Sequence, residues 1–139
     1  MTAWAILDTG PIVAFLEKGE QSHNWACDQF ASFDPGMLTC EPVITETLFI
    51  LRRRGHDHAQ LMKLLERGVI KIGLSLASHL DEIRRMMDQY AKLPMSLADA
   101  CIVCMAEMNP RAEIVTLDRH FRVYRTSDRR VLRLRTPGF

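Results

Sequence analysis

Four acidic residues are spaced along the chain where folding could gather them into one chemical site. Asp8 directly follows the apolar segment 3–7, and Asp118 directly follows the segment 113–117; both segments have the pattern of buried strands. Ligands bind beyond the carboxyl ends of strands in open parallel sheets. We therefore expect Asp8 and Asp118 at the same rim of a sheet.

The other two acids lie in strongly apolar segments that are expected to be helical. Asp99 falls in the first turn of the segment 96–108, and Glu46 is surrounded by apolar residues at 43, 44 and 48–51. A buried charge without a partner is costly, and four converging acids would repel one another. A divalent cation removes both problems, and oxygen donors suit Mg²⁺ or Mn²⁺. The pattern predicts that four acids are both metal ligands and catalytic residues: Asp8, Glu46, Asp99 and Asp118.

Each acid also has a structural explanation when it is taken alone. Ser96 and Asp99 have the spacing of a helix capping box, and Asp118 could cap the turn that follows it. Asp8 could be a turn residue at the end of a strand, and Glu46 could face solvent. The hypothesis of a metal site depends on all four acids falling where one site could collect them.

The elements that would position these acids alternate between strand and helix. Strands are predicted at 3–7, 37–39, 69–72, 113–117 and 131–134. Helices are predicted from Pro11 onward and at 22–33, 42–54, 57–67, 76–90 and 96–108, with a short helix or turn at 119–125. This alternation predicts an α/β protein, a three-layer α/β/α sandwich with a mostly parallel central sheet. The length of 139 residues predicts a single domain over 1–139.

Charge is distributed unevenly along the chain. Residues 1–50 hold seven acids and one base, whereas residues 111–139 hold eight arginines and three acids. Arginine is well suited to phosphate oxygens, so a cation site beside a basic surface is consistent with a polyanionic partner. A solvated arginine-rich surface is the alternative. No apolar run is long enough for a membrane span, and the first residues are not typical of a signal peptide. We expect a cytoplasmic protein with its four cysteines reduced.

The same four acids carry a resemblance to a known family. The motifs Ile-Leu-Asp-Thr-Gly-Pro-Ile-Val at 6–13, Ile-Thr-Glu-Thr-Leu at 44–48, Ser-Leu-Ala-Asp-Ala-Cys-Ile at 96–102 and Val-Thr-Leu-Asp-Arg-His-Phe at 115–121 resemble, in order and spacing, those of PIN domains. The length and layout are most similar to the VapC-type toxins of toxin–antitoxin pairs.

The resemblance implies an α/β/α fold, Mg²⁺- or Mn²⁺-dependent endoribonuclease activity and an antitoxin protein that blocks the site. It assigns the metal-site acids to Asp8, Glu46, Asp99 and Asp118, and hydroxyl positions near them to Thr9 and Thr116. We also expect a homodimer. Four aromatic residues are candidate platforms for base stacking, although packing in the core is the favoured role of Trp4: Trp4, Trp25, Phe121 and Tyr124.

Three other interpretations of the sequence are possible. The run Leu-Asp-Thr-Gly at 7–10 occurs in aspartic proteases, but their paired aspartates need an all-β frame, whereas this chain is rich in helices. Cys101 and Cys104 have the spacing of a redox or zinc motif, but without a second such pair we interpret them as packing. A non-catalytic PIN module that binds RNA or protein is the third alternative. The histidines at 23, 79 and 120 have no partner that the sequence identifies, and His56 and His58 are expected to be solvated.

Overall fold

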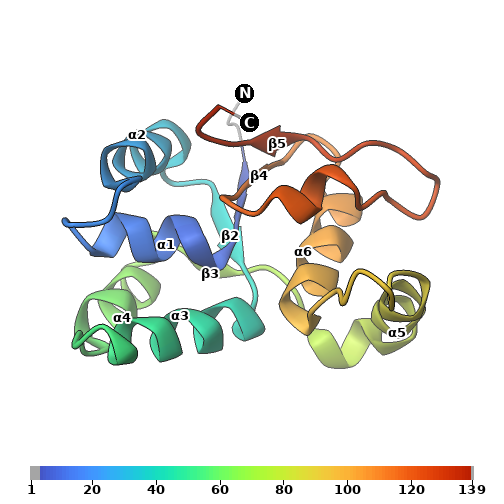
Figure 1. Cartoon of the computed structure of the whole chain (residues 1–139), viewed down its shortest axis with the longest axis horizontal. Helices are drawn as coiled ribbons and strands as arrows, with labels where there is room; N and C mark the ends of the chain where they lie inside the picture. The colour runs from blue at the N-terminus through green and yellow to red at the C-terminus, as the bar shows by residue number, and fades with distance from the viewer. Residues whose placement is uncertain (1–3, 139) are drawn as a thin grey trace.

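A five-stranded parallel sheet forms the centre of the protein in a computed structural model, which describes residues 4–138 (Figure 1). The strand order is β3–β2–β1–β4–β5, and each neighbouring pair is parallel. The strands are β1 (Ala5–Leu7), β2 (Met37–Thr39), β3 (Lys71–Ile72), β4 (Glu113–Val115) and β5 (Leu134–Arg135). The predicted parallel sheet is therefore confirmed.

Two layers of helices cover the sheet, one on each face (Figure 1). One layer holds α1 (Thr9–Leu16), α2 (His23–Phe33), α3 (Glu41–Arg53) and α4 (Ala59–Glu66). The other holds α5 (Leu80–Gln89) and α6 (Leu97–Met108). Two short 3₁₀ helices, η1 (Leu76–His79) and η2 (Arg119–Arg122), precede α5 and follow β4. This arrangement confirms the predicted α/β/α sandwich.

The order of the strands creates a switch point between β1 and β4. From β1 the chain builds outward through β2 to β3, and it then returns to place β4 on the opposite side of β1. The connections that leave the carboxyl ends of β1 and β4 consequently turn to opposite faces. A crevice opens where they separate, which is where ligands bind in open α/β sheets. Asp8 follows β1 directly and Asp118 lies three residues beyond the end of β4, so both stand at this crevice.

The core is formed by the central strands and α6. The side chains of Ile6, Leu7 and Ile114 are fully buried, as are Ile102 and Met105 of α6. A strand with both faces covered is apolar throughout rather than alternating, which explains the continuous apolar sequence of β1. Among the helices of residues 4–138, none has the length and apolar character needed to cross a membrane.

Two predicted elements differ from the structure. The predicted helix at 76–90 begins with the 3₁₀ turn η1, because the Ser75 carbonyl oxygen accepts hydrogen bonds from the Ser78 amide at 3.2 Å and the His79 ring at 2.9 Å. The predicted strand at 131–134 is also wrong: β5 begins only at Leu134, and Val131 is 69% exposed. Residues 126–130 form a tight turn that displaces the strand toward the C-terminus.

Candidate active site

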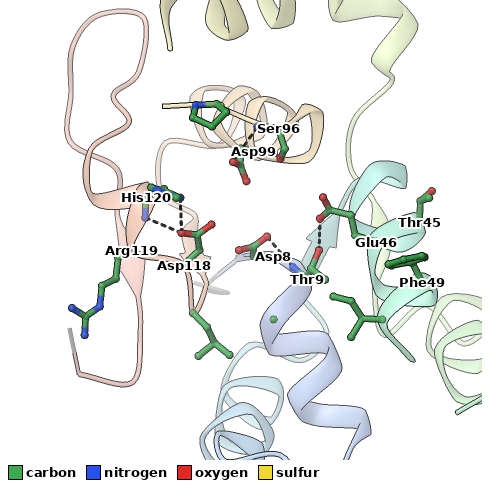
Figure 2. A pocket seen from close by; sticks show the side chains of 14 residues that line it. Asp8, Thr9, Thr45, Glu46, Phe49, Ser96, Asp99, Asp118, Arg119 and His120 are labelled. Atoms are coloured by element: carbon green, nitrogen blue, oxygen red, sulfur yellow. Dashed lines mark hydrogen bonds and ion pairs between the residues drawn. The ribbon is translucent and has the colours of Figure 1, made fainter. Parts of the chain in front are cut away.

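A cavity of about 960 Å³ lies at the carboxyl edge of β1 and β4, and all four predicted acids line it. Figure 2 shows the carboxylates of Asp8, Asp118, Asp99 and Glu46 facing one common space. They come from four different parts of the fold, namely the ends of β1 and β4 and the helices α6 and α3. The structure therefore brings the predicted residues together, which the sequence could only suggest.

Asp8 occupies the most buried position of the four, with 7% of its surface exposed. It caps α1, and its Oδ1 accepts a hydrogen bond from the Thr9 amide at 2.8 Å. Its Oδ2 accepts a hydrogen bond from the Thr116 hydroxyl at 2.7 Å. Both oxygens are thus held in place before any ligand binds.

Thr116 connects Asp8 to Asp118. The Thr116 hydroxyl donates to Asp8, and its oxygen accepts from the Asp118 amide at 2.9 Å, although β1 and β4 are about a hundred residues apart in sequence. Asp118 in turn accepts from the His120 amide at 2.9 Å and lies 3.1 Å from His120 Nδ1. Thr116 is fully buried, so this connection is shielded from water.

Asp99 is both a helix cap and a lining residue of the cavity. Ser96 and Asp99 form the capping box predicted for the start of α6, with reciprocal bonds of 3.0 and 3.2 Å. The same Oδ2 that accepts from the Ser96 amide also accepts from the Tyr124 hydroxyl at 3.1 Å. The predicted capping box is therefore confirmed, and the same residue lies on the wall of the cavity.

Glu46 faces the other acids from α3. Its Oε1 accepts a hydrogen bond from the Thr9 hydroxyl at 2.8 Å. Thr9 therefore contacts two of the four acids, Asp8 through its amide and Glu46 through its side chain. Thr9 and Thr116 both lie at the site, as the resemblance implied.

Burial, with a smaller contribution from neighbouring carboxylates, changes the pKa of two of these acids. Burial, together with the charges of Asp99 and Asp118, raises the pKa of Asp8 to about 7, although the bonds from Thr116 and Thr9 oppose the rise. Burial also raises the pKa of Asp99, with a further contribution from Asp118. Asp8 and Asp99 therefore hold their protons to a higher pH than a solvated carboxyl group does.

The donor atoms in the cavity fit a hard divalent cation. The four acids supply carboxylate oxygens, and Thr9 and Ser96 add hydroxyl oxygens to the lining of the cavity. Hard cations prefer such oxygen donors to sulfur. Within residues 4–138, no three of the four carboxylates have oxygens that all lie within 4.8 Å of one another. This spacing leaves room for water, and Mg²⁺ characteristically keeps several water ligands beside one or two carboxylates.

Several aromatic residues lie elsewhere than the sequence suggested. Phe121 and Tyr124 are buried, so the prediction that they stack on bases is wrong. Their rings pack edge to face, with centroids 5.4 Å apart. Trp4 is 40% exposed, so its predicted packing in the core is also wrong. Phe49, which no sequence pattern identified, is 60% exposed and lines the cavity.

The basic C-terminal segment contributes less to the cavity than its composition suggests. Of its eight arginines, Arg119 lines the cavity, beside His120. Arg130 pairs with Asp128 and Arg135 with Glu113, both at 2.8 Å, and Arg125 bonds to three backbone carbonyl oxygens. Partners within the protein therefore hold several of these side chains.

Comparison with known proteins gives an independent classification. The profile of the PIN domain matches residues 5–126, which is most of the chain. The chain belongs to the PIN domain family. Among solved structures it is similar to VapC20 of Mycobacterium tuberculosis, described as a sarcin–ricin loop cleaving toxin, with 20% identity, a TM-score of 0.71 and coverage of 83% of this chain and 90% of that one. No curated protein gives a significant match. The structural match confirms the PIN-type fold.

The charge at Asp8 predicts how the metal-free protein responds to pH. Between about pH 4 and pH 7 the unfolded state loses the Asp8 proton while the folded state keeps it, so the free energy of unfolding falls as pH rises. The rise in pKa from 3.8 to about 7 corresponds to about 4 kcal/mol at most. Asp8→Asn keeps a good cap and removes the charge. It should raise stability in EDTA at pH 8 and have little effect at pH 4, as measured by denaturant unfolding.

Asp57→Asn is the matched control, because exposed Asp57 likewise accepts a backbone amide at the start of a helix, that of Ala59 at 2.9 Å. It should leave the difference between pH 4 and pH 8 unchanged. A lower free energy of unfolding for Asp8→Asn than for the unaltered protein at pH 8 would show that the negative charge of Asp8 does not destabilise the folded state.

Proposed function

We propose that the protein is a Mg²⁺- or Mn²⁺-dependent endoribonuclease whose metal ligands are Asp8, Glu46, Asp99 and Asp118. The observation that carries the proposal is the placement of all four carboxylates around one cavity at the switch point of the sheet. Burial at this cavity raises the pKa of Asp8 and of Asp99, with smaller contributions from neighbouring carboxylates, and perturbed carboxyl groups that line a cavity are typical of functional sites. Membership of the PIN domain family supports the same assignment.

The bound cation would supply Lewis-acid activation of water and stabilisation of negative charge on the scissile phosphate. The residues of the chain hold the acids in position for this chemistry. Thr116 fixes Asp8, Thr9 fixes Glu46, and Tyr124 together with the capping box fixes Asp99. Because these bonds exist in the free protein, little reorganisation is needed when substrate binds.

The walls of the cavity suggest how RNA lies across the acids. Arg119 and His120 stand on one side, where a phosphate could bind, and Phe49 stands on the other (Figure 2). Phe49 also lines an adjoining hollow together with Arg52. A single strand could place its backbone near Arg119 and a base on Phe49, since base–aromatic stacking tolerates any sequence. This geometry favours single-stranded or looped RNA.

Cleavage of RNA should require both the cation and the acids. In Mn²⁺ the protein should cut a labelled RNA that contains a loop, and EDTA should abolish the cutting. Glu46→Gln should lower the cleavage rate at least about a hundredfold, which exceeds the usual loss on changing a residue that only orients a ligand. Glu41→Gln is the matched control, because exposed Glu41 lies on the same helix but outside the cavity. Gel electrophoresis gives both rates.

Three results of this assay would point elsewhere. Undiminished cleavage in EDTA would rule out the metal mechanism. Binding of RNA without cleavage would support the non-catalytic module instead. Attack by activated water leaves 5′-phosphate and 3′-hydroxyl ends, whereas a 2′,3′-cyclic phosphate would indicate general acid–base chemistry. In that case His120 becomes the first histidine to test, because it lies on the wall of the cavity beside Asp118.

Removal of the Phe49 ring should weaken substrate binding more than it slows the chemical step. Stacking of one base is worth about 1–3 kcal/mol, so Phe49→Ala should raise KM about 5- to 150-fold with a small change in kcat. Trp4→Ala removes an exposed aromatic ring at the amino edge of the sheet, remote from the acids, and should leave KM unchanged. Steady-state kinetics on single-stranded RNA separates the two constants. Equal effects of the two variants would exclude a specific role for Phe49.

The proposed biological role is that of the toxin in a toxin–antitoxin pair. The likeness to VapC20, described as a toxin, supports it, and the cavity combines acids with the apolar side chains of Phe49, Ile50 and Leu117. An antitoxin could place an Arg or Lys among the acids and apolar side chains over this wall. A homodimeric state and a cytoplasmic location stay predictions.

Expression of the protein alone should then arrest bacterial growth, and Asp8→Asn should relieve the arrest, because it removes a proposed metal ligand. Growth curves after induction, with protein levels measured by immunoblot, test this. Normal growth with abundant, RNA-cleaving protein would remove the toxin role and leave the nuclease.

A further inference from the structure

Three side chains of metal-binding type converge between α5 and α6, outside the acidic cavity. His79 stands at the start of α5, Glu82 lies in its first turn, and Cys104 lies on α6. A ring nitrogen of His79, a carboxylate oxygen of Glu82 and Sγ of Cys104 all lie within 4.8 Å of one another. The corresponding atoms in a tetrahedral zinc site are about 3.4–3.8 Å apart, given bonds of about 2.0–2.3 Å. Small side-chain movements would therefore close the group around an ion.

The His79 ring is already oriented by the fold. Its Nδ1 lies 2.9 Å from the Ser75 carbonyl oxygen. A carbonyl oxygen can only accept, so Nδ1 carries the proton and Nε2 keeps the lone pair that can bind a cation. A histidine ligand whose other nitrogen donates to a backbone carbonyl is the usual arrangement in zinc sites. The 3₁₀ turn that interrupts the predicted helix at 76–90 produces this arrangement.

Cys104 and Glu82 are already in contact. The Cys104 thiol donates to Glu82 Oε2 at 3.5 Å. Burial, the bond to Glu82 and the nearby charge of Glu107 raise the pKa of Cys104 to about 12, which keeps the metal-free group a thiol. Arg85 and Arg125 line the small cavity beside Glu82, but the Arg125 guanidinium bonds to backbone carbonyl oxygens. The surroundings thus place a sulfur donor beside the negative charges of Glu82 and Glu107.

We propose that His79, Glu82 and Cys104 form a zinc site that fastens α5 to α6. On binding, the Cys104 thiol releases one proton to solvent, and Sγ, a Glu82 oxygen and His79 Nε2 bind the ion, with water as the fourth ligand. The nitrogen, oxygen and sulfur donors favour Zn²⁺ over Mg²⁺, which prefers oxygen alone. The site is separate from the acids at the sheet edge and does not depend on the proposed nuclease activity.

The site explains two features that the fold alone leaves without a role. Cys104 is fully buried, yet it donates to the exposed residue Glu82 instead of making only apolar contacts. Residues 76–79 form a 3₁₀ turn that directs His79 toward α6 rather than continuing the predicted helix. An ion held from both α5 and α6 would stabilise the packing of these two helices.

Cobalt(II) binding to the full chain tests the proposal directly, because Co²⁺ substitutes for Zn²⁺ and a cobalt–thiolate bond absorbs in the near ultraviolet. Reduced protein in excess Mg²⁺, which occupies the acids, should develop this band with one Co²⁺ per chain, and Zn²⁺ should abolish it. Cys104→Ser should remove the band. Glu82→Gln should keep a weaker band and lower the affinity for Co²⁺ at least about tenfold.

The matched control is Cys27→Ser. Cys27 also lies beside a histidine, with Sγ 3.5 Å from His23 Nε2, but this pair lacks a third ligand in the described part of the chain. Cys27→Ser should leave the cobalt band intact. Circular dichroism verifies the fold of each variant, and Glu82→Gln alters an exposed residue that the core does not need. Three results would overturn the proposal. The unaltered protein could lack the band, the band could be lost in Cys27→Ser but kept in Cys104→Ser, or excess Mg²⁺ could remove it.

Discussion

The hydroxyl group of Thr116 fixes the geometry on which the acidic cavity depends. It donates to Asp8 and accepts from the Asp118 amide, so it joins the ends of the two strands that flank the switch point. It adds a bond between the two strand ends to the separate contacts that Asp8 makes with the Thr9 amide and Asp118 makes with His120. Because Thr116 is buried, its bond to Asp8 acts in a region of low dielectric, where a charge-assisted hydrogen bond is strong.

Helix capping places two of the acids at the cavity. Asp8 caps α1, and Asp99 completes the capping box of α6. Capping fixes the carboxylate relative to the helix axis, and the axis is fixed by the packing of its apolar face on the sheet. The buried helix α6 therefore carries Asp99 with little freedom, and Tyr124 limits that freedom further. The structural role of these acids is compatible with the proposed functional role, because capping would hold each carboxylate where a metal ligand is needed.

Sequence patterns predicted the central elements well, since buried strands and the apolar helix at 96–108 leave clear signals. The four acids could be assigned to one site because parallel strands end at one edge and the family motifs match in order. The role of Tyr124 could not be predicted, because its hydroxyl reaches Asp99 across a tertiary contact. The same is true of Phe49, whose exposure depends on the rotation of α3. The sequence pattern predicts one continuous helix at 76–90, because apolar periodicity does not reveal hydrogen bonds from side chains to the backbone. In the structure the His79 ring bonds to the Ser75 carbonyl oxygen, which the His79 amide would bond to in an α-helix.

The pKa of Asp8 links stability, proton binding and cation binding in one equilibrium. Burial of the ionised Asp8 carboxylate, with a smaller contribution from the charges of Asp99 and Asp118, lowers the stability of the folded state, and the folded protein reduces this cost by retaining a proton on Asp8 up to about pH 7. If Asp8 is a metal ligand, as proposed, a cation would have to displace that proton before it could use both Asp8 oxygens, and its apparent affinity would fall about tenfold for each pH unit below 7. Above pH 7 the proton is lost, and a bound cation would then compensate the buried charge. The burial that destabilises the ionised Asp8 side chain would in this way favour a cation near neutral pH.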